Sequence, residues 1–189
     1  MAVLRFETDR LVLRKFVNSD MQALYQLLQD EEVNVFLPWF PVKNVEETKE
    51  FYEKRFAGEK YCFAICLKDS YPIGYLTTNT DDSYDFGYAL RKEFWHRGIV
   101  TEAGKALIAQ LKQDGIPYIT ATHDRNNPRS GGVMRQLGMK YCYSYEEQWQ
   151  PKNILVTFRM FQLNLDGQEG RIYQKYWNLY DTHFVEKNI

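Results

Sequence analysis

Cysteine is scarce in this 189-residue chain, and the three that occur do not have the spacing of metal ligands. They are Cys62, Cys66 and Cys142. An odd number argues against a framework of disulfides, so we expect a reduced, cytoplasmic setting and no metal site. None has a histidine partner in a recognisable local motif, which argues against an acyl-cysteine route.

Long apolar runs and a dominant charge are also missing. The first ten residues, MAVLRFETDR, carry charges too early for a signal peptide, and no later run is long and apolar enough to span a bilayer. Lys and Arg number 24 and Asp and Glu 25, which gives a formal net charge of −1. We therefore expect no membrane partner and no general attraction to nucleic acid.

Aromatic residues are abundant. The chain has 14 Tyr, 12 Phe and 4 Trp within a hydrophobic content of 44%. A single domain of this length buries a substantial core, but this is more aromatic surface than such a core needs. Some of these rings are expected to line a pocket or a subunit contact, and a homodimer is one way to cover them.

Hydrophobic periodicity predicts alternating strands and helices. Strands are expected at 11–16, 61–67, 73–79, 84–90, 118–122, 139–148 and 154–163. Helices are expected from Asn18 or Ser19 to about 29, from Asn44 to about 56, from Gly98 to about 113, and from Asn127 to Gly138. The prolines of VFLPWFPVKN (35–44) predict an irregular loop. This order predicts a mixed α/β (α+β) single domain, with a largely antiparallel central sheet, flanking helices and one crossover.

The last residues are a separate feature. We divide the chain into a domain at 1–165 and an aromatic-rich, helical C-terminal extension at 166–189. In the extension an aromatic residue recurs every three or four positions, at Tyr173, Tyr176, Trp177, Tyr180 and Phe184. This spacing predicts a stripe along one helix. Packing against the domain's own surface is favoured over a dimer contact or a substrate lid.

The stretch FWHRGIVTEAG (94–104) enters a helix through Gly98. The first N–H groups of a helix lack internal partners and can hold a phosphate, and Arg97 can add a charge. Taken alone, one glycine favours the simpler interpretation, in which Gly98 merely relaxes a tight turn. Asn127 and Ser130 open the next helix at the mouth of the same predicted sheet, so two helix N-termini face one cleft.

Three segments in order, ETDRLVLRKF, FGYALRKEFWHRGIVTEAGKALI and NNPRSGGVMRQLGMKY, resemble the GNAT N-acetyltransferase superfamily, and within it the Rim-type branch of ribosomal-protein N-terminal acetyltransferases. The resemblance covers about 6–163 and implies acetyl-CoA as cofactor, with strands splayed at the cofactor cleft. It implies a cofactor site made of Tyr88, Ala89, Leu90, Trp95, His96, Arg97, Gly98, Ile99, Val100, Thr101, Asn127 and Ser130.

The resemblance also implies the reaction, which is transfer of the acetyl group to a primary amine by direct attack in a ternary complex. The amine belongs either to a protein N-terminus or to a small molecule. In this family a tyrosine often stands where Met134 stands here, and Met134 cannot donate a proton. A CoA-binding sensor without transferase activity therefore remains as the alternative. A nucleotide-binding module is disfavoured, because GxxxxGK[ST] and GxGxxG are both absent.

Amine attack requires a proton acceptor, and Asp85 is the first candidate, with an outward-facing strand position as the competing interpretation. Further candidates are Glu146, Glu147, His96 and His123, whereas Glu102 is expected to serve structure. For the proton donor we select Tyr141, with Tyr143 or water as the alternatives. The resemblance implies the backbone N–H of Leu90 as the oxyanion donor.

The acceptor end is expected to be built from the loop at 35–44 and the last hairpin, with the tail as a further candidate, and the loop is expected to supply an aromatic wall. Phe36, Trp39 and Phe40 are the predicted substrate-binding residues. Asp81, Asp82 and Asp85 form an acidic cluster that would attract a cationic amine. For Asp81 and Asp82 a solvated turn is the favoured interpretation.

Overall fold

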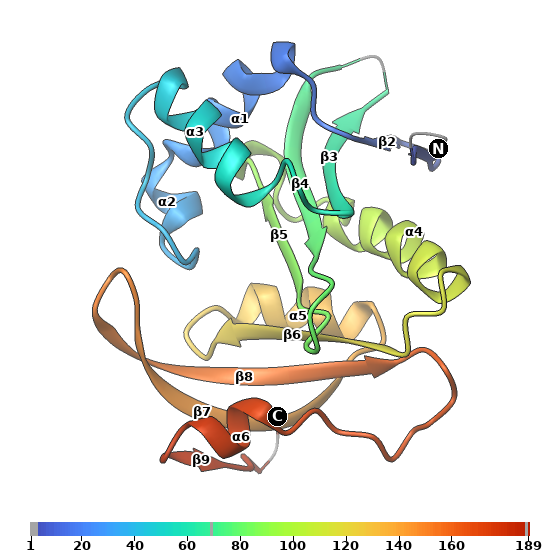
Figure 1. Ribbon diagram of the computed structural model, residues 1–189, viewed down its shortest axis with the longest axis vertical. Coiled ribbons are helices and arrows are strands. Elements are labelled where there is room, and N and C mark those ends of the chain that lie inside the picture. The colour runs from blue at the N-terminus through green and yellow to red at the C-terminus, as the bar shows by residue number, and fades with distance from the viewer. Residues whose placement is uncertain (1–3, 69, 188) are drawn as a thin grey trace.

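The computed structural model describes residues 4–68, 70–187 and 189, and it contains two antiparallel sheets that meet at an angle (Figure 1). The first sheet has the order β1 (Phe6–Glu7), β2 (Leu11–Arg14), β3 (Tyr61–Leu67), β4 (Pro72–Thr78) and β5 (Phe86–Leu90). The second has the order β6 (Tyr118–Asp124), β8 (Ile154–Asn164), β7 (Lys140–Trp149) and β9 (His183–Phe184). The predicted mixed, largely antiparallel architecture is confirmed.

The α-helices are α1 (Met21–Leu28), α2 (Glu31–Asn34), α3 (Val45–Arg55), α4 (Ile99–Gln113), α5 (Pro128–Gln136) and α6 (Lys175–Leu179). Two short 3-10 helices, η1 (Asn18–Asp20) and η2 (Lys92–Phe94), precede α1 and α4. The first three α-helices cover one face of the first sheet, and α4 covers the other (Figure 1). In the described parts of the chain, no helix is both long and apolar enough to cross a membrane.

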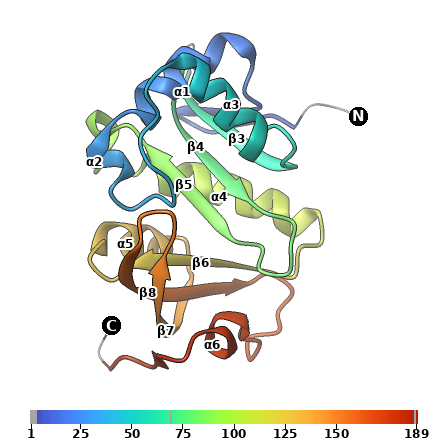
Figure 2. The same ribbon diagram turned by 60° about the vertical axis from the view of Figure 1, so that its left-hand side comes forward.

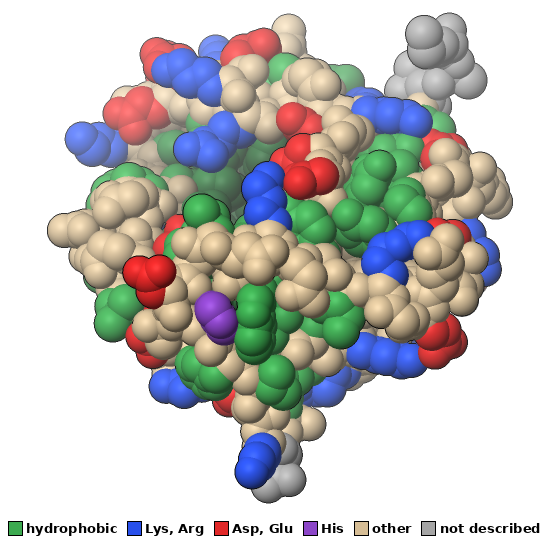
Figure 3. Space-filling view, turned by 60° about the horizontal axis from the view of Figure 1, so that its bottom comes forward, with side chains coloured by type: hydrophobic (Ala, Val, Ile, Leu, Met, Phe, Trp, Pro, Cys, Tyr) green, Lys and Arg blue, Asp and Glu red, His purple; other side chains and the backbone are tan. Residues whose placement is uncertain are grey.

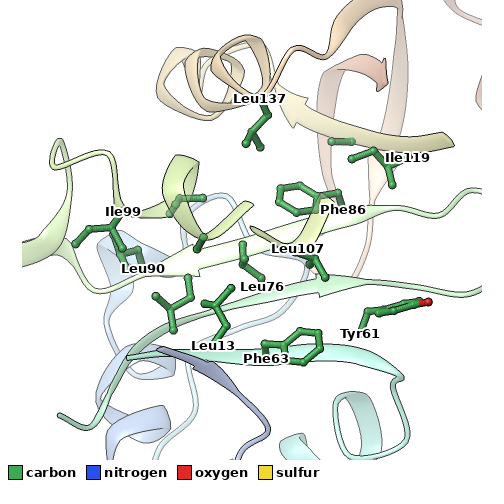
Figure 4. Packing of buried hydrophobic residues seen from close by; sticks show 14 of the residues in the cluster. Leu13, Tyr61, Phe63, Leu76, Phe86, Leu90, Ile99, Leu107, Ile119 and Leu137 are labelled. Carbon is green, nitrogen blue, oxygen red and sulfur yellow. The ribbon is translucent and has the colours of Figure 1, made fainter. Parts of the chain in front are cut away.

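Alternation along the strands explains this layering. Phe63 and Ile65 of β3 face the core beneath α4, where Leu107 is fully buried, while Cys62 and Ala64 face α1 and α3. Successive side chains of a strand point to opposite faces, so both faces of this sheet are covered by apolar side chains. Figure 4 shows the cluster under α4, in which side chains of both sheets meet.

The two sheets touch at one point and then diverge. Asp85 and Thr120 form an isolated parallel bridge, and the Thr120 N–H donates to the Tyr84 carbonyl at 3.3 Å. Beyond this bridge, the described residues of β5 and β6 form no further ladder. The strands therefore open like a V towards α5 (Figure 2), which confirms the predicted splay.

Local chemistry sets the helix starts, and one predicted cap is wrong. Asn44 accepts a hydrogen bond from the Glu47 N–H at 2.8 Å, as predicted for α3. Asn18 and Ser19, the two predicted caps, both lie inside η1, and Asp20 precedes α1 instead. The Asp20 carboxylate accepts the Val17 N–H at 2.8 Å and binds Arg14. The loop at 35–44 is irregular, as predicted, but the four-residue α2 before it was missed.

The C-terminal extension packs on the domain's own surface, as favoured, but it is not one helix. Its helix covers only Lys175–Leu179, Tyr180 is already extended, and Phe184 lies in β9 beside β7. Pairing with β7 and ring stacking on Tyr145 of that strand outweigh the tendency of this segment to continue as a helix. The division of the chain at 165 stays a prediction.

Candidate active site

A single cavity of about 1360 Å³ lies between the splayed sheets. Its walls come from the loop after α2, from β5, from the first turns of α4 and α5, and from β7. It brings together every residue that the sequence implied for the cofactor, namely Tyr88, Ala89, Leu90, Trp95, His96, Arg97, Gly98, Ile99, Val100, Thr101, Asn127 and Ser130.

The start of α4 offers backbone N–H groups to this cavity. His96 and Gly98 both have left-handed φ values, 61° and 70°, which curl the chain before the helix. The first helical hydrogen bond runs from the Glu102 N–H to the Gly98 carbonyl at 3.0 Å, so the N–H groups of Ile99, Val100 and Thr101 precede it. Such a turn suits a pyrophosphate.

The backbone conformation at Gly98 favours glycine, as expected if this residue forms a tight turn. Its φ of 70° strains any residue with a Cβ atom. Space alone would admit one, because a Cβ atom would meet only Arg10 Nη2, at 3.8 Å. Gly98 also lines the cavity, so a ligand there can approach the backbone of the turn.

The turn is fixed from behind by Glu102, which confirms its structural role. Its carboxylate accepts hydrogen bonds from Thr8 Oγ1 at 2.5 Å and from Arg10 Nε at 2.7 Å. Arg10 Nη1 also donates to the Arg97 carbonyl at 3.0 Å. These bonds tie the turn to the chain entering β2.

One edge of β5 faces the cavity. The Arg91 N–H donates to the Ile73 carbonyl, and the Asn79 N–H donates to the Asp85 carbonyl, so odd-numbered residues of β5 pair with β4. The N–H and C=O groups of Tyr88 and Leu90 consequently point the other way, into the V. Trp95 Nε1 donates to the Leu90 carbonyl at 2.7 Å. The Tyr88 and Leu90 N–H groups can pair with an extended ligand.

The opposite wall is the start of α5. Asn127 caps this helix through its Oδ1, which accepts the Ser130 N–H at 3.3 Å, as predicted. The Arg129 guanidinium lies 5.5 Å from the centre of the Trp95 ring, and both residues line the cavity. Positive charge therefore gathers at the end of the cavity where the turn before α4 lies.

Asp85 lines the cavity rather than facing outward. Its Oδ1 is buried and has no hydrogen-bond partner among the described residues. Burial, followed by the nearby charge of Asp81, raises the pKa of Asp85 to about 7. A carboxyl group that titrates near neutrality suits proton transfer from an ammonium group.

The other candidate bases are placed differently. Glu147 and His96 line the cavity, whereas Glu146 does not. His123 also lines it but is only 3% exposed, and its Nδ1 lies 2.8 Å from the Asp124 carbonyl and so carries the proton. Its Nε2 lies against Gly131, and burial lowers its pKa. His123 is a neutral core residue.

The structure places Tyr141 away from the cavity, which corrects the predicted proton donor. Its hydroxyl lies 2.9 Å from Ser144 Oγ and accepts the Glu186 N–H at 2.9 Å. Tyr143 is buried and donates to the Tyr173 carbonyl at 2.7 Å. Tyr145 lines the cavity instead, because a bulge between Tyr141 and Tyr143 shifts the register of β7.

Two of the three residues predicted for the acceptor wall line the cavity, and their role stays a prediction. Phe36 and Trp39 line the cavity, but Phe40 does not and is 59% exposed to solvent. Asp81 binds the Ser83 N–H at 2.8 Å within the turn, as favoured, and Asp82 pairs with Lys175 at 3.1 Å. Sequence reasoning missed Tyr145, Tyr176 and Tyr180 as cavity residues, although the aromatic stripe was a signal for the last two.

The cysteines are ordinary core residues. Cys62 and Cys66 are buried, Cys142 is half-buried, and all three are free thiols. Burial raises the pKa of Cys62 to about 12 and that of Cys142 to about 11. Because the thiolate is the nucleophile, these protonated thiols are poor candidates for acyl transfer.

Comparison with known proteins identifies the family. A model described as "Acetyltransferase (GNAT) domain" matches residues 10–140. The uncharacterized N-acetyltransferase YnaD of Bacillus subtilis is 27% identical over 153 residues, covering 75% of this chain and 89% of that protein. A GNAT-family acetyltransferase structure from Bacillus anthracis superposes with a TM-score of 0.76 at 21% identity, covering 86% of this chain and 99% of that one.

A structure of RimL, the ribosomal L7/L12 alpha-N-protein acetyltransferase, in complex with coenzyme A, has the same fold. It superposes with a TM-score of 0.75 at 21% identity and covers 84% of this chain and 96% of that chain. The expectations of a GNAT fold, of acetyl-CoA as cofactor and of acetyltransferase chemistry are confirmed by the family match. The chain belongs to the GNAT family of acetyltransferases.

Proposed function

We propose that this chain transfers the acetyl group of acetyl-CoA to a primary amine by direct attack in a ternary complex, with Asp85 accepting the amine proton. One observation carries the proposal. One cavity joins the turn before α4, the free edge of β5 and Asp85, whose Oδ1 has no hydrogen-bond partner in the described part of the chain. Donor and acceptor can therefore be bound together.

The cofactor's parts fit different stretches of this cavity. The N–H groups of Ile99, Val100 and Thr101, helped by Arg97, hold the pyrophosphate. The outward backbone groups of Tyr88 and Leu90 pair with the extended arm as a neighbouring strand would, and Asn127 and Ser130 flank it. Acetyl-CoA, when bound, supplies the thioester whose acetyl group is transferred.

The protein's own part in the chemistry is to handle one proton and one developing charge. An alkyl ammonium must become neutral before it can attack, and the carboxylate of Asp85 takes its proton. The Leu90 N–H, which points into the V, stabilises negative charge on the carbonyl oxygen. As the amide forms, the attacking nitrogen releases a further proton, and water would relay that proton to the departing thiolate, because Tyr141 is turned away and Met134 cannot donate.

The acceptor is a primary amine, of a protein N-terminus or of a small molecule. RimL is described as acting on the alpha-amine of a ribosomal protein, and that activity belongs to RimL. A homodimer stays a prediction.

Thermal unfolding with acetyl-CoA, and with ATP and NAD as controls, tests the cofactor site. A ligand present at about 100 times its dissociation constant stabilises the folded state by roughly 2.7 kcal/mol. We expect a shift specific to acetyl-CoA, followed by amine-dependent thiol release. No shift at millimolar acetyl-CoA would contradict the cofactor site, and a shift without thiol release from any amine would favour the CoA sensor.

A further inference from the structure

The segment from Tyr173 to Glu186, here called the tail segment, is attached along one edge of the second sheet. Phe184 and His183 of β9 pair with Ser144 and Tyr145 of β7. The Glu146 N–H donates to the Thr182 carbonyl at 2.9 Å, which extends the pairing. The tail segment is therefore held by strand pairing.

An ion pair fastens the end of the tail segment. The Glu186 carboxylate accepts hydrogen bonds from Arg159 Nε at 2.9 Å and Nη2 at 2.6 Å, and from Ser144 Oγ at 2.6 Å. The side chains of Glu186 and Arg159 are only 15% and 20% exposed. A two-bond, partly buried pair of this kind fixes orientation as well as adding stability.

Two tail tyrosines join the cavity wall. The Tyr180 ring stacks on Tyr145 at 4.7 Å and 9°, and the Tyr176 ring stacks on it at 5.2 Å and 27°. All three tyrosines line the cavity that contains Asp85. Trp177, between them in sequence, packs on Tyr143 at 5.4 Å and does not line the cavity. Figure 3, which brings the α6 side of the molecule forward, shows hydrophobic side chains gathered on this face.

The stacked tyrosines have carboxylates beside them. Tyr176 lines the same cavity as Asp85, and burial, followed by the charge of Asp85, raises the pKa of its phenol. The pKa of Tyr180 is raised by burial and then by its contact with Glu147. An apolar ring surface between two acidic groups suits a cationic amine with a flat apolar body.

The β7–β8 hairpin bounds the other side of this end of the cavity. Lys152 Nζ, from the hairpin tip, donates to the carbonyls of Asn34 at 2.5 Å and Val35 at 2.8 Å. These bonds connect the second sheet to the end of α2, across the cavity from the tail segment. An acceptor site bounded by a hairpin tip and a tail favours a compact molecule over a folded protein.

We propose that the tail segment is the acceptor wall, in which Tyr176 and Tyr180 hold the flat apolar body of a small primary amine with its ammonium group towards Asp85. This proposal rests on the proposed acetyltransferase function and names its substrate class.

Binding of three probe amines to the full chain tests the proposal, by calorimetry with and without CoA. The probes are phenethylamine, putrescine and a tetrapeptide with a free N-terminus. We expect phenethylamine to bind best, and Tyr176→Ala and Tyr180→Ala to weaken its binding by about tenfold or more. Trp177→Ala, which removes an equally half-buried tail ring outside the cavity, should change its binding by less than about threefold.

Tyr176→Phe and Tyr180→Phe keep the rings and should keep most of the affinity, which provides folded variants if the alanine forms unfold. The acetyl-CoA melting shift should be unchanged in every variant. Equal affinity of the wild type and the ring-removing variants, tighter binding of putrescine or the tetrapeptide, or no amine binding at all would overturn the proposal. Because binding is also measured without CoA, a failure of the cofactor site would appear separately, as a missing acetyl-CoA shift.

Discussion

The Tyr88 hydroxyl on β5 reaches across the opening between the sheets to Ser130 on α5. It lies 2.6 Å from Ser130 Oγ and donates to the Ser130 carbonyl at 3.0 Å. Both residues belong to the cofactor site implied by the sequence, and this contact joins its two walls. This side-chain contact therefore connects β5 to α5 in the region where β5 and β6 are no longer paired through their backbones.

Tyr88→Phe should reduce the free energy of unfolding by about 1 kcal/mol, since a half-buried hydroxyl loses its bonds to Ser130. Ser130→Ala removes Oγ but keeps the carbonyl acceptor, so its cost should be smaller. Urea unfolding of both single variants and of the double variant gives the coupling between the two groups. Strictly additive losses would contradict a direct interaction.

Asp85→Asn should lower turnover by about 10²-fold or more while leaving the acetyl-CoA melting shift intact. In the wild type, kcat/KM should rise with pH as Asp85 loses its proton near 7. The variant should lack this step, because asparagine cannot accept a proton. A variant with wild-type rates across the pH range would exclude Asp85 as the base.

The same substitution should alter how stability depends on pH. The pKa of Asp85 in the folded protein, about 7, lies above its ordinary 3.8, so the protonated carboxyl favours folding. That contribution is fully present below about 3.8 and is lost as the pH rises through about 7. The melting temperature of Asp85→Asn relative to wild type should therefore increase between pH 4 and pH 8. An unchanged difference would contradict the raised pKa.

Gly98→Ala should destabilise the fold by about 1 kcal/mol, because alanine at a φ of 70° is strained. Gly115→Ala is the matched control. Its φ is 77°, nothing lies within 4 Å of an added Cβ atom, and it is outside the cavity. Both variants should lose similar stability, but only Gly98→Ala should bind acetyl-CoA more weakly. Equal acetyl-CoA shifts in the two variants would contradict a phosphate at this turn.

Glu186→Gln should cost about 2 kcal/mol of stability near neutral pH, since it breaks a charged pair with Arg159. Hydrogen bonds from Arg159 lower the pKa of Glu186 to about 2, below its ordinary 4.5. The stabilisation is present above about 4.5 and is lost as the pH falls through about 2. Chemical unfolding should show that the difference in free energy of unfolding between wild type and Glu186→Gln is smaller at pH 3 than at pH 7.

Glu169→Gln provides the comparison for Glu186. Glu169 pairs with Lys140 at 3.1 Å, but the two side chains are 81% and 77% exposed. Such a surface pair contributes little, so this variant should unfold within about 0.5 kcal/mol of wild type. A loss as large as that of Glu186→Gln would mean that burial does not distinguish the two pairs.

Features set by local chemistry could be predicted from the sequence. Gly98 before α4 and Asn127 with Pro128 at α5 fix helix starts within a few residues, whereas the full set of cofactor residues came from the family resemblance. Asp85 could only be a candidate, because its burial depends on the bridge to Thr120, which comes from a distant strand.

Features set by tertiary contacts could not be predicted. The bulge between Tyr141 and Tyr143 shifts the register of β7, so the tyrosine that reaches the cavity is Tyr145. Phe40 is aromatic like Phe36 and Trp39, so the sequence does not distinguish the three. The path of the loop exposes the side chain of Phe40 to solvent. The aromatic spacing of the extension predicted one long helix, but only Lys175–Leu179 is helical, because the residues that follow pair with β7.

The early separation of β5 from β6 also bears on how the protein avoids self-association. A strand with an unpaired edge normally invites a strand from another molecule. Among the described residues, the N–H groups of Tyr88 and Leu90 have no strand partner, and they belong to the wall of a cavity that the start of α5 and part of β7 also line. A thin, extended ligand can reach that edge, whereas a neighbouring protein's sheet is too bulky to approach it. The fold thereby keeps an open hydrogen-bonding edge without the aggregation hazard that exposed edges carry.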